Sequence, residues 1–256
     1  MITTSGSVLS GTTRGTAVVT GGARGIGRAF AEALAAGGHA VAILDLSNAE
    51  DAVAAITSRG GVAVAAQGDA ADPDDVQSFR QLVTDHLPRV RVLVNNAGIS
   101  PYLPFESTTL DDWRGIMRVN LDSVFLLTQA FLDDLTSSGA GRVVNLTSSV
   151  VWDLQARNMT AYATSKAGIV GLTRALAGEF GVHGITVNCI APGIVLTPDI
   201  EERVTSERLL QYRDRQAIKD LARAEDLVSA LDFLVSEASS HVTATVLPVN
   251  GGRVVV

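Results

Sequence analysis

Strand-like and helix-like patterns alternate along almost the whole sequence, and this alternation restricts the fold more than any other feature. Seven short apolar runs have the composition of buried strands, at residues 16–20, 39–44, 62–67, 90–95, 142–147, 185–191 and 245–249. Apolar residues with helical spacing lie between them, over about residues 25–36, 49–58, 73–86, 109–136, 160–181 and 199–236. Because repeated βα units form parallel sheets with helices on both faces, the sequence predicts a doubly wound α/β fold with seven parallel strands.

The chain length and composition favour a single domain with this architecture. α/β folds of 256 residues often form one domain, and the sequence has no internal repeat or Pro/Ser-rich linker. Only 5% of the residues are aromatic while 46% are hydrophobic, which suits helices packed on a sheet better than an aromatic-cored β-sandwich. We therefore expect one domain over residues 15–256, a flexible tail over residues 1–14, and a helical lid between about residues 197 and 243.

Charge and cysteine content exclude several classes of partner. The net charge of −7 and the absence of a Lys/Arg cluster argue against nucleic acid. No apolar run reaches the 18 residues that a membrane span needs. Cys189 is the only cysteine and lies in an apolar run, and the four histidines are scattered, so neither a disulfide nor a metal site is expected. These features predict a cytoplasmic protein without nucleic-acid, membrane or metal partners.

A glycine-rich turn follows the first predicted strand. In TGGARGIG, residues 20–27, the glycines at 21, 25 and 27 would let the backbone N–H groups of the next helix approach a pyrophosphate. The turn lacks the GK[ST] of a P-loop, and its spacing alone is also compatible with an ordinary tight turn. The residues of this turn that we assign to a cofactor site are Gly21, Arg24, Gly25, Ile26 and Gly27.

An acidic residue at the end of the second strand indicates which dinucleotide would bind. Asp45 lies twenty residues after Gly25, where a dinucleotide fold places the carboxylate that accepts hydrogen bonds from the adenosine ribose. A carboxylate would repel the 2′-phosphate of NADP, and the next residue, Leu46, offers no compensating charge. Arg24 is the opposing signal, because a basic residue in the glycine turn could serve NADP. The balance favours NAD.

Six short motifs in one order link the chain to a known family. They are TGGARGIG, the NNAG at 95–98, the RVNL around Asn120, the VVNLTSS ending at Ser149, the YATSK at 162–166 and the APGIVLT at 191–197. Together they resemble the short-chain dehydrogenase/reductase family in its common form of about 250 residues. The resemblance covers almost the whole chain and implies a Rossmann fold that binds a nicotinamide dinucleotide.

The resemblance implies a catalytic role for four residues. Tyr162 would be the general acid/base, and Lys166, one helical turn later, would hold the nicotinamide ribose and stabilise the phenolate. Ser149 would hydrogen-bond the substrate oxygen, with Ser148 the less favoured candidate. Asn120 would hold a water that relays protons to the lysine, although a helix-kink asparagine is the alternative.

Further residues are assigned to the cofactor by the same resemblance. Asn96, Ala97 and Gly98 would line the adenosine side, and Asp69 and Ala70 would contact adenine, although Asp69 could instead cap a helix. The segment that would contact the nicotinamide carboxamide and the pyrophosphate contains Pro192, Gly193, Val195 and Thr197.

One residue departs clearly from the family pattern. Trp152 stands three positions after Ser149, where the family commonly has a small residue. We expect its ring to form a wall of the substrate pocket; the alternatives are the outer surface of the loop or a subunit contact.

These features favour an NAD-dependent dehydrogenase that interconverts a secondary alcohol and a ketone. A 3-oxoacyl thioester reductase using NADPH is the alternative enzyme, and a non-catalytic NAD(H)-sensing protein is the alternative from another class. The family usually forms tetramers, and the apolar C-terminal RVVV is consistent with a homotetramer.

Overall fold

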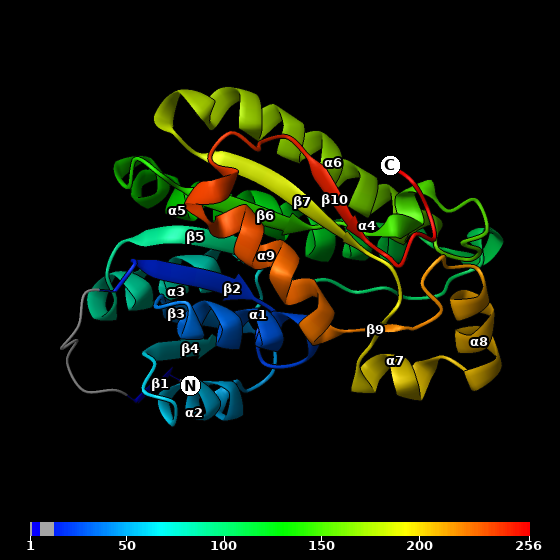
Figure 1. Cartoon of the computed structure of the whole chain (residues 1–256), viewed down its shortest axis with the longest axis horizontal. Helices are drawn as coiled ribbons and strands as arrows, with labels where there is room; N and C mark the ends of the chain where they lie inside the picture. The colour runs from blue at the N-terminus through cyan, green and yellow to red at the C-terminus, as the bar shows by residue number, and fades with distance from the viewer. Residues whose placement is uncertain (1, 6–12) are drawn as a thin grey trace.

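The computed structural model describes residues 2–5 and 13–256, and its centre is one eight-stranded sheet (Figure 1). The strand order is β1-β4-β3-β2-β5-β6-β7-β10. The strands are β1 (Ile2–Ser5), β2 (Thr16–Thr20), β3 (Ala40–Asp45), β4 (Ala63–Gln67), β5 (Val90–Asn95), β6 (Arg142–Leu146), β7 (Thr186–Pro192) and β10 (Val246–Val249). All strands from β2 onward in this sheet are parallel, so the predicted seven-stranded parallel sheet is confirmed.

Helices cover both faces of the sheet. On one face are α1 (Gly25–Ala36), α2 (Glu50–Thr57) and α9 (Val228–Val235), and on the other are α3 (Pro73–His86), α5 (Ser123–Ser137) and α6 (Thr160–Phe180). Each face has its own apolar core. Every residue of β2 and β7 is buried, because a strand in the middle of such a sheet is covered from both sides.

The N-terminal expectation is wrong for residues 2–5. Strand β1 pairs antiparallel with β4, with Ile2 opposite Ala66 and Ser5 opposite Ala63. Without β1, β4 would be an edge strand with unpaired backbone groups, and three of the four residues of ITTS are β-branched. Residues 1 and 6–12 of the predicted tail lie outside the described residues.

The helix predicted over residues 109–136 is in fact two helices joined by a π-helical turn. They are α4 (Leu110–Met117), the π turn η2 (Arg118–Asp122) and α5. Thr109 begins α4 with a capping box to Asp112. The π turn contains Asn120, and such turns are frequent at functional sites because they reorient one side chain within a helix.

The first part of the region predicted as a lid lies beyond the carboxyl ends of the strands, whereas its last helix, α9, packs on the sheet (Figure 1). It contains α7 (Pro198–Arg203) and α8 (Ser206–Asp214), so its helical character is confirmed. It also contains a short strand that the sequence did not predict, β9 (Ala222–Arg223), which pairs with β8 (Val195–Leu196). Among the described residues no helix is both long enough and apolar enough to cross a bilayer.

Candidate active site

The glycine turn lies between β2 and α1 and is held by an asparagine that directly follows the neighbouring strand β5. Gly21 and Gly25 have φ values of +66° and +57°, a region that favours glycine. A Cβ on Gly27 would come within 2.1 Å of the Gly21 carbonyl oxygen. The Asn96 side chain donates to the Thr20 and Gly21 carbonyls at 2.9 and 3.0 Å. Only glycine fits at this crossing, so the backbone at the start of α1 is left open to a ligand.

Asp45 is fixed at the end of β3 by two backbone hydrogen bonds. One carboxylate oxygen accepts from the Ala23 N–H at 2.9 Å, and the other accepts from the Ser47 N–H at 2.8 Å. The carboxylate is therefore anchored beside the glycine turn, and each oxygen retains a lone pair for a further donor. Leu46, which follows it, is 61% exposed.

The predicted cofactor residues line two adjoining cavities along the carboxyl edge of the sheet. Residues that line the first are Gly21, Arg24, Gly25, Ile26, Gly27, Asp45, Leu46, Asp69, Ala70, Asn96, Ala97, Gly98 and Thr197. Residues that line the second are Ser149, Tyr162, Lys166, Pro192, Gly193 and Val195. Ile26, Asn96, Gly98 and Thr197 line both. Glycines, an anchored carboxylate and two adjoining cavities fit a dinucleotide.

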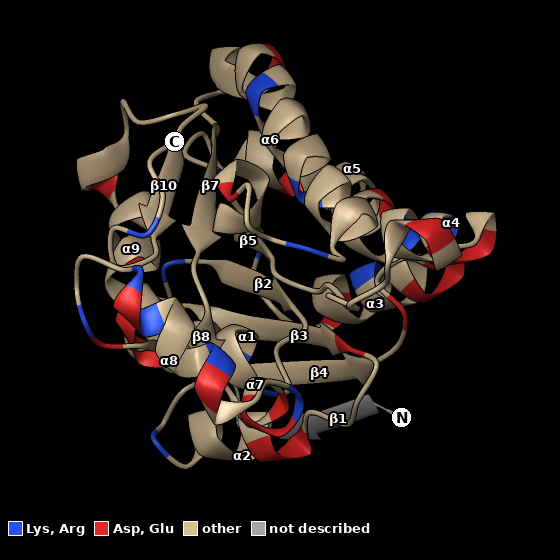
Figure 2. Ribbon diagram, turned by 90° about the vertical axis from the view of Figure 1, so that its right-hand side faces the viewer, with Lys and Arg blue, Asp and Glu red and all other residues tan. Residues whose placement is uncertain are grey.

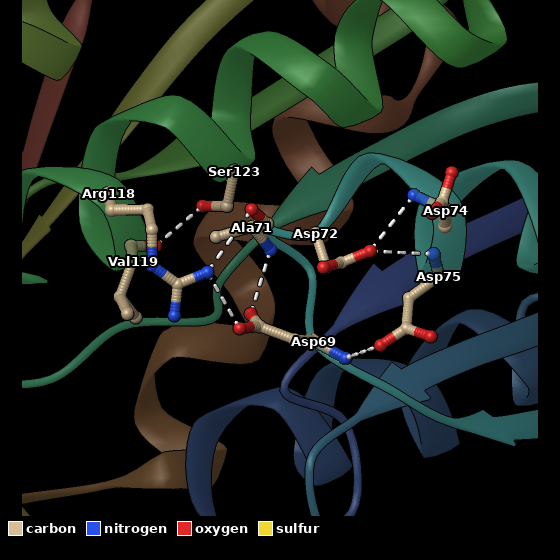
Figure 3. A network of polar contacts seen from close by, with 8 residues as sticks. All are labelled: Asp69, Ala71, Asp72, Asp74, Asp75, Arg118, Val119 and Ser123. Carbon is tan, nitrogen blue, oxygen red and sulfur yellow. Dashed lines mark hydrogen bonds and ion pairs between the residues drawn. The ribbon is translucent and has the colours of Figure 1, made fainter.

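Asp69 does not cap a helix, but its carboxylate is already engaged (Figure 3). One oxygen accepts from the Ala71 N–H, and the other pairs with Arg118 of η2, both at 2.8 Å. The cap of α3 is Asp72, whose carboxylate accepts from two backbone N–H groups of the first turn. Arg118 thus ties the lining of the first cavity to the turn that carries Asn120.

Asn120 is fully buried and locked by three hydrogen bonds. Its amide nitrogen donates to the Ile99 carbonyl at 3.0 Å and to the Ser165 hydroxyl at 2.9 Å, and its carbonyl oxygen accepts from the Ile99 N–H at 2.8 Å. Gly98 is beside it, and a Cβ there would lie 3.1 Å from the Asn120 oxygen and 3.3 Å from the Lys166 nitrogen. The asparagine and the lysine therefore lie close together across Gly98.

Lys166 and Tyr162 share one face of α6 within the second cavity. The Lys166 nitrogen donates to the Leu146 carbonyl at 2.8 Å and lies 5.9 Å from the centre of the Tyr162 ring. Burial lowers the pKa of Lys166 to about 8. Burial raises the pKa of the Tyr162 phenol, and a hydrogen bond with the Ser148 hydroxyl acts in the opposite direction.

Comparisons with known proteins agree with this geometry. A family model described as enoyl-(acyl carrier protein) reductase matches residues 21–253. A 3-oxoacyl-[acyl-carrier-protein] reductase from Synechocystis sp. is 36% identical over 93% of this chain and 96% of its own length. A solved short-chain dehydrogenase/reductase from Serratia marcescens is 31% identical, with a TM-score of 0.89 over 94% of this chain and 98% of that one. The chain belongs to the short-chain dehydrogenase/reductase family.

Another solved relative bears on the cofactor of this short-chain dehydrogenase/reductase. A structure from Beutenbergia cavernae, assigned as an NAD(P)-dependent gluconate 5-dehydrogenase, contains NADP at low occupancy. It is 38% identical, with a TM-score of 0.88 over 94% of this chain and 97% of that one. The present chain is thus an NAD(P)-dependent oxidoreductase that acts on alcohol or ketone substrates.

Two serines follow β6 in this short-chain dehydrogenase/reductase, and both line the second cavity. Ser149, the sequence candidate, is buried at the start of the 3₁₀ turn η3 (Ser149–Trp152). Ser148 caps that turn, its hydroxyl accepting from the Val150 N–H at 3.2 Å. The Ser148 hydroxyl also forms a hydrogen bond with the Tyr162 phenol. Ser148 is therefore a stronger candidate for binding the substrate oxygen than the family spacing suggests.

Trp152 does not form a wall of the cavity, which corrects the expectation from the sequence. Its ring packs on a small apolar cluster that includes Val124, Ile169 and Cys189. Val150 lines the cavity instead. The η3 turn directs the two side chains differently, and burial of an indole on apolar neighbours is favourable. Trp152 is therefore a packing residue of the η3 loop.

Two tyrosines of the second cavity were not singled out as site residues by the sequence analysis. Tyr102, in the loop after β5, and Tyr212, on α8, both line the second cavity with Tyr162. No motif identifies these two tyrosines. The chain has only three tyrosines, and this small number was the one feature of the sequence that could have drawn attention to them.

Proposed function

We propose that this enzyme interconverts a secondary alcohol and a ketone, with Tyr162 as the general acid/base. The observation that carries the proposal is the convergence of Tyr162, Lys166 and Ser149 in one cavity that adjoins the glycine turn. When bound, the nicotinamide supplies or accepts the hydride at the carbinol carbon.

The protein would handle the proton at the substrate oxygen. Because burial raises the pKa of Tyr162, the phenol is protonated at neutral pH and suits the donation of a proton to a ketone oxygen. The hydroxyls of Ser149 and Ser148 would orient that oxygen. Lys166 and Asn120, close together across Gly98, would carry the replacement proton toward the phenol through water.

A cofactor-linked assay tests this function. Sugars, polyols, steroids, hydroxyacids and acyl thioesters would be offered with NAD and NADP, and nicotinamide absorbance would be followed. We expect turnover of at least one secondary alcohol. Cofactor binding without turnover of any alcohol or ketone would instead favour the NAD(H)-sensing alternative.

A 3-oxoacyl thioester reductase is the second candidate enzyme, and the Synechocystis relative favours it. Such an enzyme would receive an acidic acyl carrier on a basic surface. Around the carboxyl edge, however, basic and acidic segments are interspersed on α7 and α8 (Figure 2). Reduction of a 3-oxoacyl thioester with NADPH at a higher kcat/KM than any free ketone would establish this alternative.

The cofactor preference is predicted from Asp45. We expect NAD to exceed NADP in kcat/KM by at least about tenfold, since a hydrogen bond to a charged group contributes roughly 1.5–3 kcal/mol and a 2′-phosphate would be repelled. Asp45→Ser should narrow the ratio, as measured by steady-state kinetics with both cofactors. Asp51→Asn, which removes an exposed carboxylate on the neighbouring α2, is the matched control. Equal use of NADP by the unaltered enzyme would contradict the prediction.

The assembly is predicted to be a homotetramer. Phe125 on α5 is 51% exposed, and Val255 at the C-terminus is 89% exposed, so both would gain from a subunit contact. Light scattering should give the mass of a tetramer, and Phe125→Asp should shift it to a smaller species. A monomer at micromolar concentration would refute the prediction.

A further inference from the structure

All three tyrosines of the chain line the second cavity. They come from three separate segments, with Tyr102 after β5, Tyr162 on α6 and Tyr212 on α8. Tyr102 and Tyr212 are not needed for the proton chemistry, yet each offers an aromatic ring and a hydroxyl beside the reacting phenol. A ring and a hydroxyl together suit a ligand that has both C–H faces and polar substituents.

An arginine lies against each of the two additional tyrosine rings. The Arg208 guanidinium carbon is 4.4 Å from the centre of the Tyr102 ring, and that of Arg253 is 4.0 Å from the centre of the Tyr212 ring. Neither arginine lines the cavity. Tyr212 thus contacts both the cavity and the Arg253 guanidinium.

Arg253 is held in place by a buried ion pair. Its side chain donates to one Asp153 oxygen at 3.0 and 2.6 Å, and the two side chains are only 4% and 9% exposed. The second terminal nitrogen, Nη1, is buried without a hydrogen-bond partner in the part of the chain that the structure describes. Asp153 follows η3, so the pair joins the C-terminal segment to the loop that carries Ser149.

The cavity itself contains almost no charge. Of the described residues that line it, only Lys166 is charged, and its ammonium group already donates to the Leu146 carbonyl. A carboxylate or phosphate on the substrate would lose its hydration shell in this cavity, and no guanidinium group of the described residues lines the cavity to compensate for the lost hydrogen bonds. The cavity volume is about 210 Å³, below the roughly 300–1,000 Å³ of typical ligand sites.

We propose that the substrate is a small uncharged cyclic secondary alcohol or ketone, and that Tyr212 helps to reject anionic analogues by shielding Arg253. The proposal rests on the proposed alcohol dehydrogenase function. The ring of the substrate would stack on the tyrosine faces, and its polar substituents would bond to the hydroxyls of Tyr102 and the two serines. An uncharged ring would enter the cavity without losing the hydration of an ion.

A pair of substrates that differ only in charge tests the proposal. 4-Hydroxycyclohexanecarboxamide and 4-hydroxycyclohexanecarboxylate share the ring, the reacting carbon and nearly the same volume. We expect the wild-type enzyme to prefer the carboxamide in kcat/KM by at least about tenfold. Equal use of the two, or preference for the carboxylate, would overturn the proposal without any variant.

Two variants at one position test the role of Tyr212. Tyr212→Ala removes the ring between the cavity and Arg253, so the preference for the carboxamide should fall by about tenfold or more. Tyr212→Phe keeps the shielding ring and should keep the preference within about threefold of wild type. An unchanged preference in a folded Tyr212→Ala variant would overturn the shielding role.

The proposal and the proposed function fail in distinguishable ways. Turnover of open-chain secondary alcohols without turnover of either ring substrate would overturn the cyclic substrate and leave the dehydrogenase function intact. Binding of NAD by calorimetry without turnover of any alcohol would overturn both.

Discussion

Replacement of Tyr162 by Phe should lower kcat by about 10² to 10⁴-fold, the usual contribution of a general acid/base. The variant keeps the ring on α6 and the packing around it, but no group remains at that position to move a proton at the substrate oxygen. Steady-state kinetics with any alcohol that the wild-type enzyme oxidises would measure the loss. Calorimetric affinity for NAD should change little, because the phenol hydroxyl is only one contact in a long site.

Tyr212→Phe is the matched control for that experiment. It removes a phenolic hydroxyl from the same cavity, but from a residue with no place in the proton path. Its kcat should stay within about tenfold of wild type. If Tyr162→Phe retained more than half of the wild-type kcat, the proton would be handled by another group.

Lys166→Met should abolish most activity while it stabilises the fold at neutral pH. The variant loses the ammonium group beside Tyr162, so we expect kcat/KM to fall by at least about 10²-fold. Burial lowers the pKa of Lys166 to about 8, which means that the folded protein bears the cost of a buried charge. After allowance for the lost bond to Leu146, we expect a gain in the free energy of unfolding of about 1–2 kcal/mol at pH 7.

The pH dependence of this gain identifies its cause. Below pH 8 the lysine is protonated in both the folded and the unfolded state, so the cost of the buried charge is present in full. Between about pH 8 and the ordinary value of 10.5 the folded state loses its proton first, and the cost disappears. Chemical denaturation should therefore show the advantage of Lys166→Met at pH 7 and its loss near pH 10. A constant difference across this range would point to packing instead of charge.

Most of the fold could be predicted because local patterns and tertiary structure agree. Buried parallel strands such as β2 and β7 read as short, largely apolar runs, and glycines before α1 mark its start. The cofactor residues were also predictable, because the ends of parallel strands meet at one edge of the sheet. Gly21 and Asp45 are distant in sequence, yet strand order alone brings them together.

The features that could not be predicted depend on contacts across the fold. Strand β1 forms because β4 has a free edge, and a short tail gives no sign of this. Trp152 lies at a position where the family suggests a pocket, but the apolar cluster near Ile169 competes for its indole. Tyr102 and Tyr212 lie in segments whose placement over the cavity follows from loops, where sequence patterns carry the least information.

The π turn η2 has a consequence for how this protein tolerates insertions and deletions. The π turn holds one residue more than an α-helical turn, and one residue corresponds to about 100° of rotation about the helix axis. The buried face of α5 is therefore rotated by about this angle from where an unbroken α-helix continuing α4 would place it. Deletion of a single residue within 118–122 would restore an ordinary helix but rotate the whole of α5 against the sheet. The Asn120 side chain would lose its hydrogen bonds to Ile99, and the Phe131 side chain would turn out of the core. The number of residues between Thr109 and Ser137 therefore cannot change without rotating α5. The loops on either side can gain or lose residues without this effect.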